Sequence, residues 1–149
     1  MSNDWSGDSS RWTEEKKLMS LHESFRPKVE AVLAALREQG FQPRIVYAWR
    51  GVEVQRKLVA EGKSKVRFSF HNAQKPDGTP ASYAADIVDR RWGWTEAAER
   101  NGFWRALGEA ARAQGLVWGG DWKSFPDVAH IQGRPNTELA AVKRESGLA

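Results

Sequence analysis

The stretch Gly115–Gln132 reads GLVWGGDWKSFPDVAHIQ. Its two ends, Leu116–Trp118 and Val128–Gln132, are short apolar runs that favour β-strands. The pair Gly119-Gly120 directly after the first run is typical of a turn. We therefore predict two short strands here, separated by a turn and a polar loop.

Three further strands are predicted upstream of this stretch. Phe41–Ala48 has the β-formers Ile, Val and Tyr at its centre, Val66–Phe70 alternates apolar and polar residues, and Tyr83–Val88 is a third short run. Residues 72–82 are predicted to be a loop, because they contain the dense set of turn formers Lys75–Pro80.

Apolar residues at helical spacing predict four helices. In the clearest, Pro27–Gln39, four apolar side chains share one face, and a glycine follows the last turn. The other three are Val52–Glu61, Thr95–Gln114 with an interruption near Gly102, and Thr137–Glu145. This order of elements predicts an α+β fold, with a small, mostly antiparallel sheet flanked by helices.

The chain has 149 residues, the size of one ordinary domain. Residues 1–12 are polar and are predicted to form a flexible N-terminal arm, so the domain is expected to span residues 13–149. A hydrophobic content of 40% excludes a wholly disordered chain. Because cysteine is absent, a disulfide scaffold, a thiol nucleophile and a cysteine-based zinc site are also excluded.

The 23 basic and 19 acidic residues give a net charge of +4, and no block of like charges occurs. This spread favours a solvated basic surface over a nucleic-acid-binding face, so no nucleic-acid partner is expected. No apolar run approaches the ~20 residues of a membrane helix, and the N-terminus lacks the pattern of a secretory signal. We expect no membrane insertion and a cytoplasmic protein, unless another protein releases it.

Histidines and carboxylates in the strand and loop regions suggest a metal site. His71, Asp86 and His130 would give zinc three protein ligands and leave a fourth position for water. Asp127, three residues before His130, could act as a base near such a site. On composition alone, Asp77 and Asp89 compete with Asp86 for the carboxylate position. The third histidine, His22, is interpreted as structural.

Several short motifs in a fixed order resemble a known family. They are Ser69-Phe70-His71, Ala84-Ala85-Asp86-Ile87, the run Gly115–Phe125 and Asp127-Val128-Ala129-His130, preceded by Tyr47–Gly51 with Gln55 downstream. Together they resemble the zinc D-alanyl-D-alanine carboxypeptidase and L-alanyl-D-glutamate endopeptidase superfamily. The tryptophan-rich run is most similar to its phage endolysin branch, and the resemblance covers roughly residues 21–135.

The resemblance implies that His71, Asp86 and His130 bind Zn²⁺ and that Asp127 is the general base. It implies that Arg50 stabilises the oxyanion, a task that suits a permanently charged, planar guanidinium.

The resemblance also places Ser69 near the metal or the substrate. Trp122 is a candidate substrate-binding residue, because the run Trp118–Trp122 could wall the groove. Core packing beneath the groove is the equal alternative for this run.

Two departures from the family pattern stand out. Fourteen residues separate His71 from Asp86, which is more than in many members, and the extra residues predict an inserted loop at the edge of the cleft. Asp77 within that loop is therefore the alternative ligand to Asp86. In addition, Trp49 stands where the family has Tyr, and the usual preceding Gly is missing.

The expected function is zinc-dependent hydrolysis of peptidoglycan stem peptides, between L-Ala and D-Glu, by a monomeric phage or prophage endolysin. The alternatives are a D-alanyl-D-alanine carboxypeptidase or dipeptidase, a zinc-binding module without catalysis, and a basic nucleic-acid-binding domain.

Overall fold

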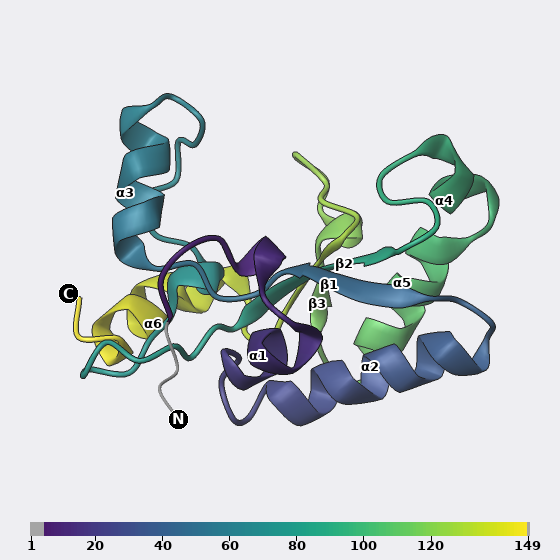
Figure 1. Ribbon diagram of the computed structural model, residues 1–149, viewed down its shortest axis with the longest axis horizontal. Helices are drawn as coiled ribbons and strands as arrows, with labels where there is room; N and C mark the ends of the chain where they lie inside the picture. Colours follow the sequence, from purple (N-terminus) through teal and green to yellow (C-terminus); the bar gives the residue numbers. More distant parts are fainter. Residues whose placement is uncertain (1–4, 149) are drawn as a thin grey trace.

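The computed structural model describes residues 5–148, which form an α+β structure around one four-stranded sheet (Figure 1). The strands are β1 (Pro43–Tyr47), β2 (Ala84–Asp89), β3 (Val117–Trp118) and β4 (His130–Gln132), in the spatial order β1-β2-β4-β3. Every neighbouring pair is antiparallel. The predicted sheet is therefore confirmed, and β2 lies in its interior between β1 and β4.

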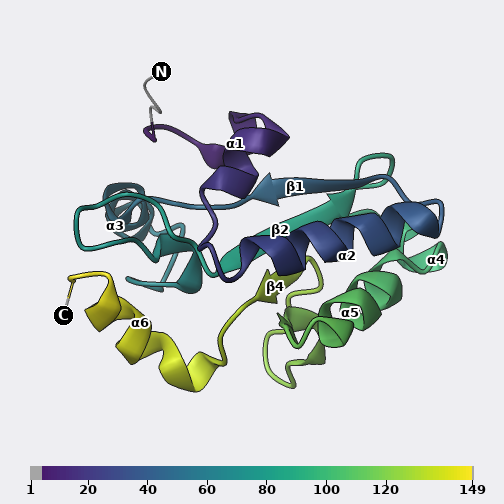
Figure 2. The same ribbon diagram turned by 90° about the horizontal axis from the view of Figure 1, so that it is seen from below.

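Two amphipathic helices cover one face of this sheet, α2 (Arg26–Glu38) and α5 (Phe103–Ala113) (Figure 2). Their apolar faces are buried against each other and the strands, as Leu33, Leu36 and Leu107 show with at most 2% exposure. The short helix α4 (Glu96–Arg100) precedes α5. The predicted interruption between them occurs at Gly102, whose φ of +74° favours glycine.

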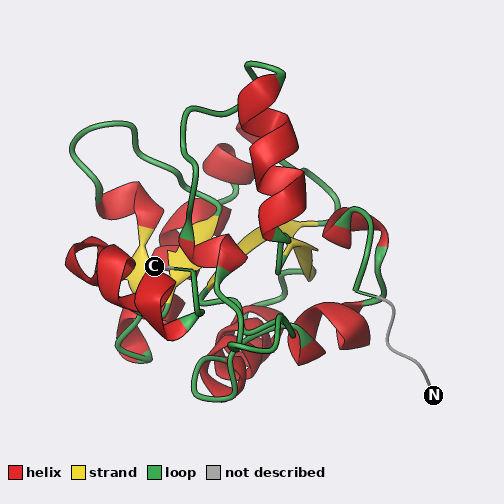
Figure 3. Cartoon of the chain, turned by 90° about the vertical axis from the view of Figure 1, so that its left-hand side faces the viewer, coloured by secondary structure: helices red, strands yellow, loops and turns green. Residues whose placement is uncertain are grey.

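The remaining helices lie around the ends of the sheet. Helix α1 (Glu14–Met19) contacts β1, and its buried Lys17 donates a hydrogen bond of 2.6 Å to the carbonyl of Ile45. Helices α3 (Val52–Ala60) and α6 (Leu139–Glu145) stand together at one end of the molecule (Figures 1 and 3). Four short 3₁₀ turns, η1–η4, are the other helical elements of the described residues. They are Ser9–Arg11, Phe70–Asn72, Gly119–Asp121 and Asn136–Glu138.

The predicted strand Val66–Phe70 is wrong. Residues 66–69 are irregular and lead into the 3₁₀ turn Phe70–Asn72. A side chain takes the place of a partner strand, because the amide of Gln55 donates a hydrogen bond to the carbonyl of Val66. The apolar alternation survives only as the burial of Phe68 and Phe70.

The predicted N-terminal arm lies partly outside the described residues, which begin at residue 5. From residue 5 onward the segment lies against the domain: Trp12 stacks on Trp49, and the backbone amide of Ala48 donates to the buried hydroxyl of Ser9. The flexibility of this segment and the boundary at residue 12 stay predictions.

A buried carboxylate, that of Asp89, lies at the C-terminal end of β2. Asp89 has no exposed surface and accepts hydrogen bonds from the guanidinium of Arg91 (2.8 Å) and from the backbone amide of Gln42 (2.8 Å). Burial raises the pKa of Asp89, but these hydrogen bonds and the Arg91 charge outweigh it and lower the pKa to about 2. The ionised form is therefore the one that the fold stabilises.

We predict that Asp89→Asn lowers the free energy of unfolding by about 1–3 kcal/mol at neutral pH. Because the folded-state pKa is depressed, this difference between wild type and variant should be full above pH ~4 and shrink as the pH falls toward 2. Urea unfolding across this range measures it. Asp121→Asn, which removes an exposed ion pair with Arg112, is the control and should change little. A difference that does not depend on pH would contradict the assignment.

Candidate active site

All seven residues predicted for the site line one open cleft of about 480 Å³. They come from β2, the start of β4, the turn Phe70–Asn72 and the loops that follow β1 and β3. They are Arg50, Ser69, His71, Asp86, Trp122, Asp127 and His130. The antiparallel pairing of β2 with β4 sets the centre of the cleft, since Asp86 and His130 are register partners.

Two imidazoles converge on one carboxylate at this centre. His71 Nε2 lies 3.4 Å from Asp86 Oδ2, and His130 Nδ1 lies 3.2 Å from Asp86 Oδ1. One ligand-type atom from each of the three residues lies within 4.8 Å of the others. Two neutral imidazoles and a carboxylate are a donor set that zinc accepts while a fourth position stays open.

The second nitrogen of each imidazole is held by a protein oxygen. His71 Nδ1 lies 2.7 Å from the carbonyl of Ala48, and His130 Nε2 lies 2.7 Å from Gln132 Oε1. The amide nitrogen of Gln132 in turn donates to the carbonyl of Arg134 and to Asn136, which directs Oε1 toward His130. Each histidine therefore donates outward from one nitrogen and turns its other nitrogen toward Asp86, the orientation that such outer partners give to metal-binding histidines.

The charge state of the trio also suits a metal. Burial raises the pKa of Asp86, but the two histidines outweigh it and hold the pKa well below its usual range. Burial lowers the pKa of His130, while its hydrogen bond with Asp86 raises it, with a net upward shift. The carboxylate is thus ionised without a metal, which is the form that a metal ligand requires.

Asp127 faces the same cleft from the loop before β4. Partial burial raises the pKa of its carboxyl group, and the negative charge of Asp86 raises it further. Its backbone amide donates to the carbonyl of Gly119 (2.9 Å), and a Cβ at Gly119 would lie 2.3 Å from the carbonyl oxygen of Asp127. The absence of a side chain at Gly119 therefore allows the backbone of Asp127 to approach this closely.

Arg50 extends into the cleft from the loop after β1. Its backbone amide donates to the carbonyl of His71 (2.8 Å), which ties this loop to the metal-type donors. Its guanidinium donates to Gln55 Oε1 at 3.2 Å. Gln55 is buried, and its amide nitrogen bonds Ser64 and Val66. A buried amide on α3 thus directs the cation toward the cleft.

Comparison with known proteins agrees with this arrangement. Residues 78–133, which include Asp86, Asp127 and His130, match the family model described as D-alanyl-D-alanine carboxypeptidase. The chain is 29% identical over 135 residues to the peptidoglycan L-alanyl-D-glutamate endopeptidase CwlK of Bacillus subtilis, covering 78% of this chain and 75% of that protein.

In both comparisons the chain is similar to the D-alanyl-D-alanine carboxypeptidase and L-alanyl-D-glutamate endopeptidase superfamily. These likenesses support a metallopeptidase of that kind.

Solved structures of this superfamily share the fold. The L-Ala D-Glu endopeptidase ChiX of Serratia marcescens superposes with a TM-score of 0.57 at 24% identity, over 81% of this chain and 86% of that one. VanYB, solved with D-alanine-D-alanine, gives 0.50 at 19% identity, over 85% of this chain and 76% of that one. At these identities the likeness concerns the fold alone.

The alternative carboxylates lie away from the superfamily motif. Asp77 is exposed in a turn, where it accepts hydrogen bonds from Thr79, and Asp89 is bound to Arg91. His22 stacks on Tyr83 and contributes no donor to the trio. The structure therefore groups Asp86, and neither competitor, with the two histidines.

The predicted inserted loop does not lie at the edge of the cleft, so this expectation is wrong. None of residues 75–80 lines it. Instead, the segment packs near the C-terminal end of α6, where the backbone amide of Gln74 donates to Ser146 and Pro76 contacts Gly147.

One tryptophan of the run Trp118–Trp122 lines the cleft, and the other packs beneath it. Trp122 lines the cleft with its ring 5.3 Å from that of His130. Trp118 packs below: its indole donates to the carbonyl of Val128 (2.7 Å) and fills the space that a Cβ would need at Gly108 and Gly120.

Ser69 serves the backbone as well as lining the cleft. It begins the 3₁₀ turn that carries His71, with its hydroxyl accepting from the His71 amide at 3.3 Å.

Three side-chain amides orient the site residues, and the sequence analysis did not predict their contacts. They are the amides of Gln55, Asn72 and Gln132. Asn72 is fully buried, accepts from the Ser69 amide (2.7 Å) and donates to the carbonyl of Arg50 (2.7 Å). The position of Gln132, two residues after His130, carried a usable signal, because alternate residues of a strand share a face.

We predict that His71→Ala abolishes stoichiometric zinc binding, because two protein ligands would remain. Elemental analysis after dialysis against a weak chelator measures it. The matched control is His22→Ala, which removes the histidine outside the trio and should retain one zinc per chain. Equal zinc contents in the two variants would remove His71 from the ligand set.

Proposed function

We propose that this chain hydrolyses an amide bond in the stem peptides of peptidoglycan, with zinc held by His71, Asp86 and His130. The observation that carries the proposal is the convergence of these three donors within 4.8 Å in a cleft that also holds Asp127 and Arg50. The relative from Bacillus subtilis, a peptidoglycan L-alanyl-D-glutamate endopeptidase by name, supports the same substrate class.

Zinc bound by these residues would polarise the scissile carbonyl group and lower the pKa of water to near neutrality. Asp127 accepts the proton of the attacking water and returns it to the leaving amine. The raised pKa of its carboxyl group makes the carboxylate a better acceptor of the water proton, and the protonated group remains acidic enough to give the proton to the leaving amine.

Arg50 stabilises the negative charge that develops on the carbonyl oxygen. Its guanidinium is permanently charged and carries several N–H donors in a plane, of which one is used by Gln55. The remaining donors are available to the oxyanion. A charge that is already oriented requires little reorganisation during the reaction, which is the basis of this kind of stabilisation.

The bond that we favour is the one between L-Ala and D-Glu, because the relative that matches most of the chain carries that activity in its name. Removal of terminal D-Ala is the second candidate, favoured by the description of the matching family model. Ser69 and Trp122 line the cleft beside the donors and are proposed to contact the peptide.

Within residues 5–148, no helix is long and apolar enough to cross a bilayer. A phage or prophage endolysin role, a cytoplasmic location before release to the wall, and a monomeric state stay predictions.

We predict that Asp127→Ala keeps its zinc but loses about 10²–10⁴-fold in hydrolysis, because proton transfer loses its acceptor. Mass spectrometry of digested peptidoglycan measures this and identifies the bond. Stem peptides that begin at D-Glu indicate the endopeptidase, and loss of terminal D-Ala alone indicates the carboxypeptidase.

Asp121→Ala is the matched control, since it removes an exposed carboxylate from the same loop and should remain active. Full activity of Asp127→Ala would exclude it as the base. Bound zinc with no product from the wild type would favour a binding module.

We predict that Arg50→Ala lowers kcat by about 10²–10³-fold, as the loss of one oxyanion donor does in other hydrolases, with KM changed much less. Steady-state kinetics on a synthetic stem peptide separate the two constants. Arg105→Ala, which removes an exposed cation of α5 that lines neither the cleft nor the groove beside it, is the control and should retain kcat. A variant of Arg50 that raises KM alone would assign this residue to binding rather than to catalysis.

A further inference from the structure

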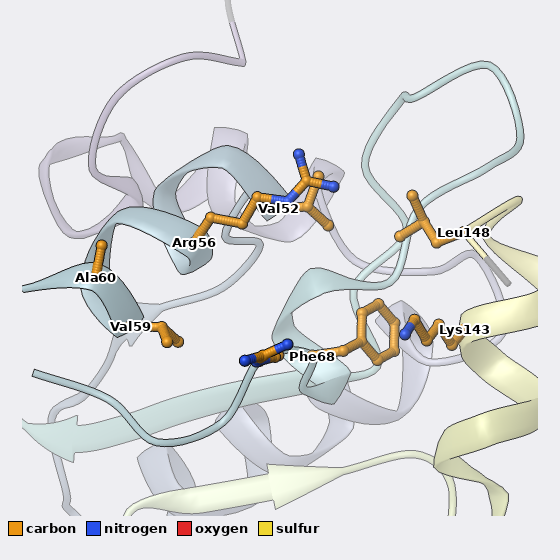
Figure 4. A pocket seen from close by; sticks show the side chains of 8 residues that line it. Val52, Arg56, Val59, Ala60, Phe68, Lys143 and Leu148 are labelled. Carbon is orange, nitrogen blue, oxygen red and sulfur yellow. The ribbon is translucent and has the colours of Figure 1, made fainter. Parts of the chain in front are cut away.

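A second groove adjoins the cleft at its α3–α6 end. Its apolar lining comes from Val52 and Val59 on α3, from Leu148 beyond α6, and from Phe68 between them (Figure 4). Its volume is about 460 Å³. The buried ring of Phe68 lines both this groove and the cleft that holds the metal-type donors. A ligand that extends past Phe68 would therefore occupy both.

The rim of the groove is cationic. Arg56, Arg67 and Lys143 are exposed and line it, and no acidic residue of the described part of the chain does. Arg56 already pairs with Glu53 at 3.0 Å on the surface. The side chains of Arg67 and Lys143 have no hydrogen-bond or ion-pair partner among residues 5–148.

Nearby acidic residues do not neutralise these two cations. Glu61, after α3, lies 3.5 Å from Lys63, and Glu145 of α6 lies 2.7 Å from Arg134. Two uncompensated charges thus face an apolar floor, and such a surface selects a ligand that combines carboxylates with aliphatic groups.

We propose that this groove binds the carboxylate-bearing part of the stem peptide that lies beyond the scissile bond. The inference rests on the proposed function and names a substrate subsite that the reacting residues do not provide. Past L-Ala, the stem peptide carries the free carboxylate of D-Glu and, at its end, a C-terminal carboxylate next to the methyl group of D-Ala. Arg67 and Lys143 bind these carboxylates, and the apolar floor contacts the methyl and methylene groups.

The test compares two double variants with the same change in net charge. Arg67→Ala/Lys143→Ala removes the groove cations, and Arg105→Ala/Lys28→Ala removes an exposed Arg and Lys from α5 and α2 on another face. All four side chains are exposed, so thermal unfolding should show both variants folded. The substrates are a synthetic stem peptide with free carboxylates and the same peptide with those carboxylates amidated.

For the free peptide, the groove variant should have a KM about 5–20-fold higher than the wild type and a kcat within about 2-fold of it. The two lost charge contacts are exposed and stabilise the bound substrate and the transition state equally, so their loss changes KM and leaves kcat. The control variant should match the wild type. For the amidated peptide, wild type and groove variant should have equal KM values. The Kd of the free peptide in an Asp127→Ala background should show the same 5–20-fold difference without turnover.

Equal KM values for the two double variants, or an equal loss on both peptides, would overturn the subsite while leaving the peptidase function intact. A wild-type protein that holds zinc but cleaves neither peptide nor peptidoglycan would overturn the proposed function, and the subsite with it.

Discussion

The arrangement of the whole cleft depends on one carboxylate held between two imidazoles. Asp86 lies on an interior strand, and His130 faces it across the β2–β4 pair, so the sheet register fixes two of the three donors. Three polar groups so deeply buried are tolerated because each has a partner: Ala48 for His71, Gln132 for His130, and both imidazoles for Asp86.

The sequence predicted those parts of the fold that local periodicity determines. Helix α2, with four buried apolar residues on one face, matches its predicted range closely, and the break at Gly102 follows from a backbone conformation that glycine favours. Val66–Phe70 has the alternation of a strand but no strand beside it. Strand formation needs a partner from elsewhere in the chain, and here a single side chain, Gln55, occupies the backbone acceptor instead.

The grouping of the site residues could be anticipated, but not the contacts that orient them. His71, Asp86, Asp127 and His130 are chemically distinctive, and their order along the chain resembles a known motif. Gln55 belongs to the motif, and Gln132 shares a strand face with His130. The hydrogen bonds that these two amides and Asn72 make, across up to 22 residues of chain, nevertheless do not follow from the sequence. Metal affinity depends on such outer hydrogen bonds, whose loss typically costs about 10–100-fold in affinity.

The fourteen residues between the first and second donors have a structural role away from the cleft. Through Gln74 and Pro76 this segment packs on Ser146 and Gly147, at the end of α6. Helix α6 in turn supplies Leu139 to the cleft and Lys143 to the basic groove, while Leu148 beyond it lines the groove floor. Since β2 carries Asp86 directly after this segment, the same length of chain joins the strand of the central donor to the helix that lines the cleft and the groove. A change in its length would therefore alter substrate reach before it altered the donor geometry, because the sheet register holds Asp86 independently.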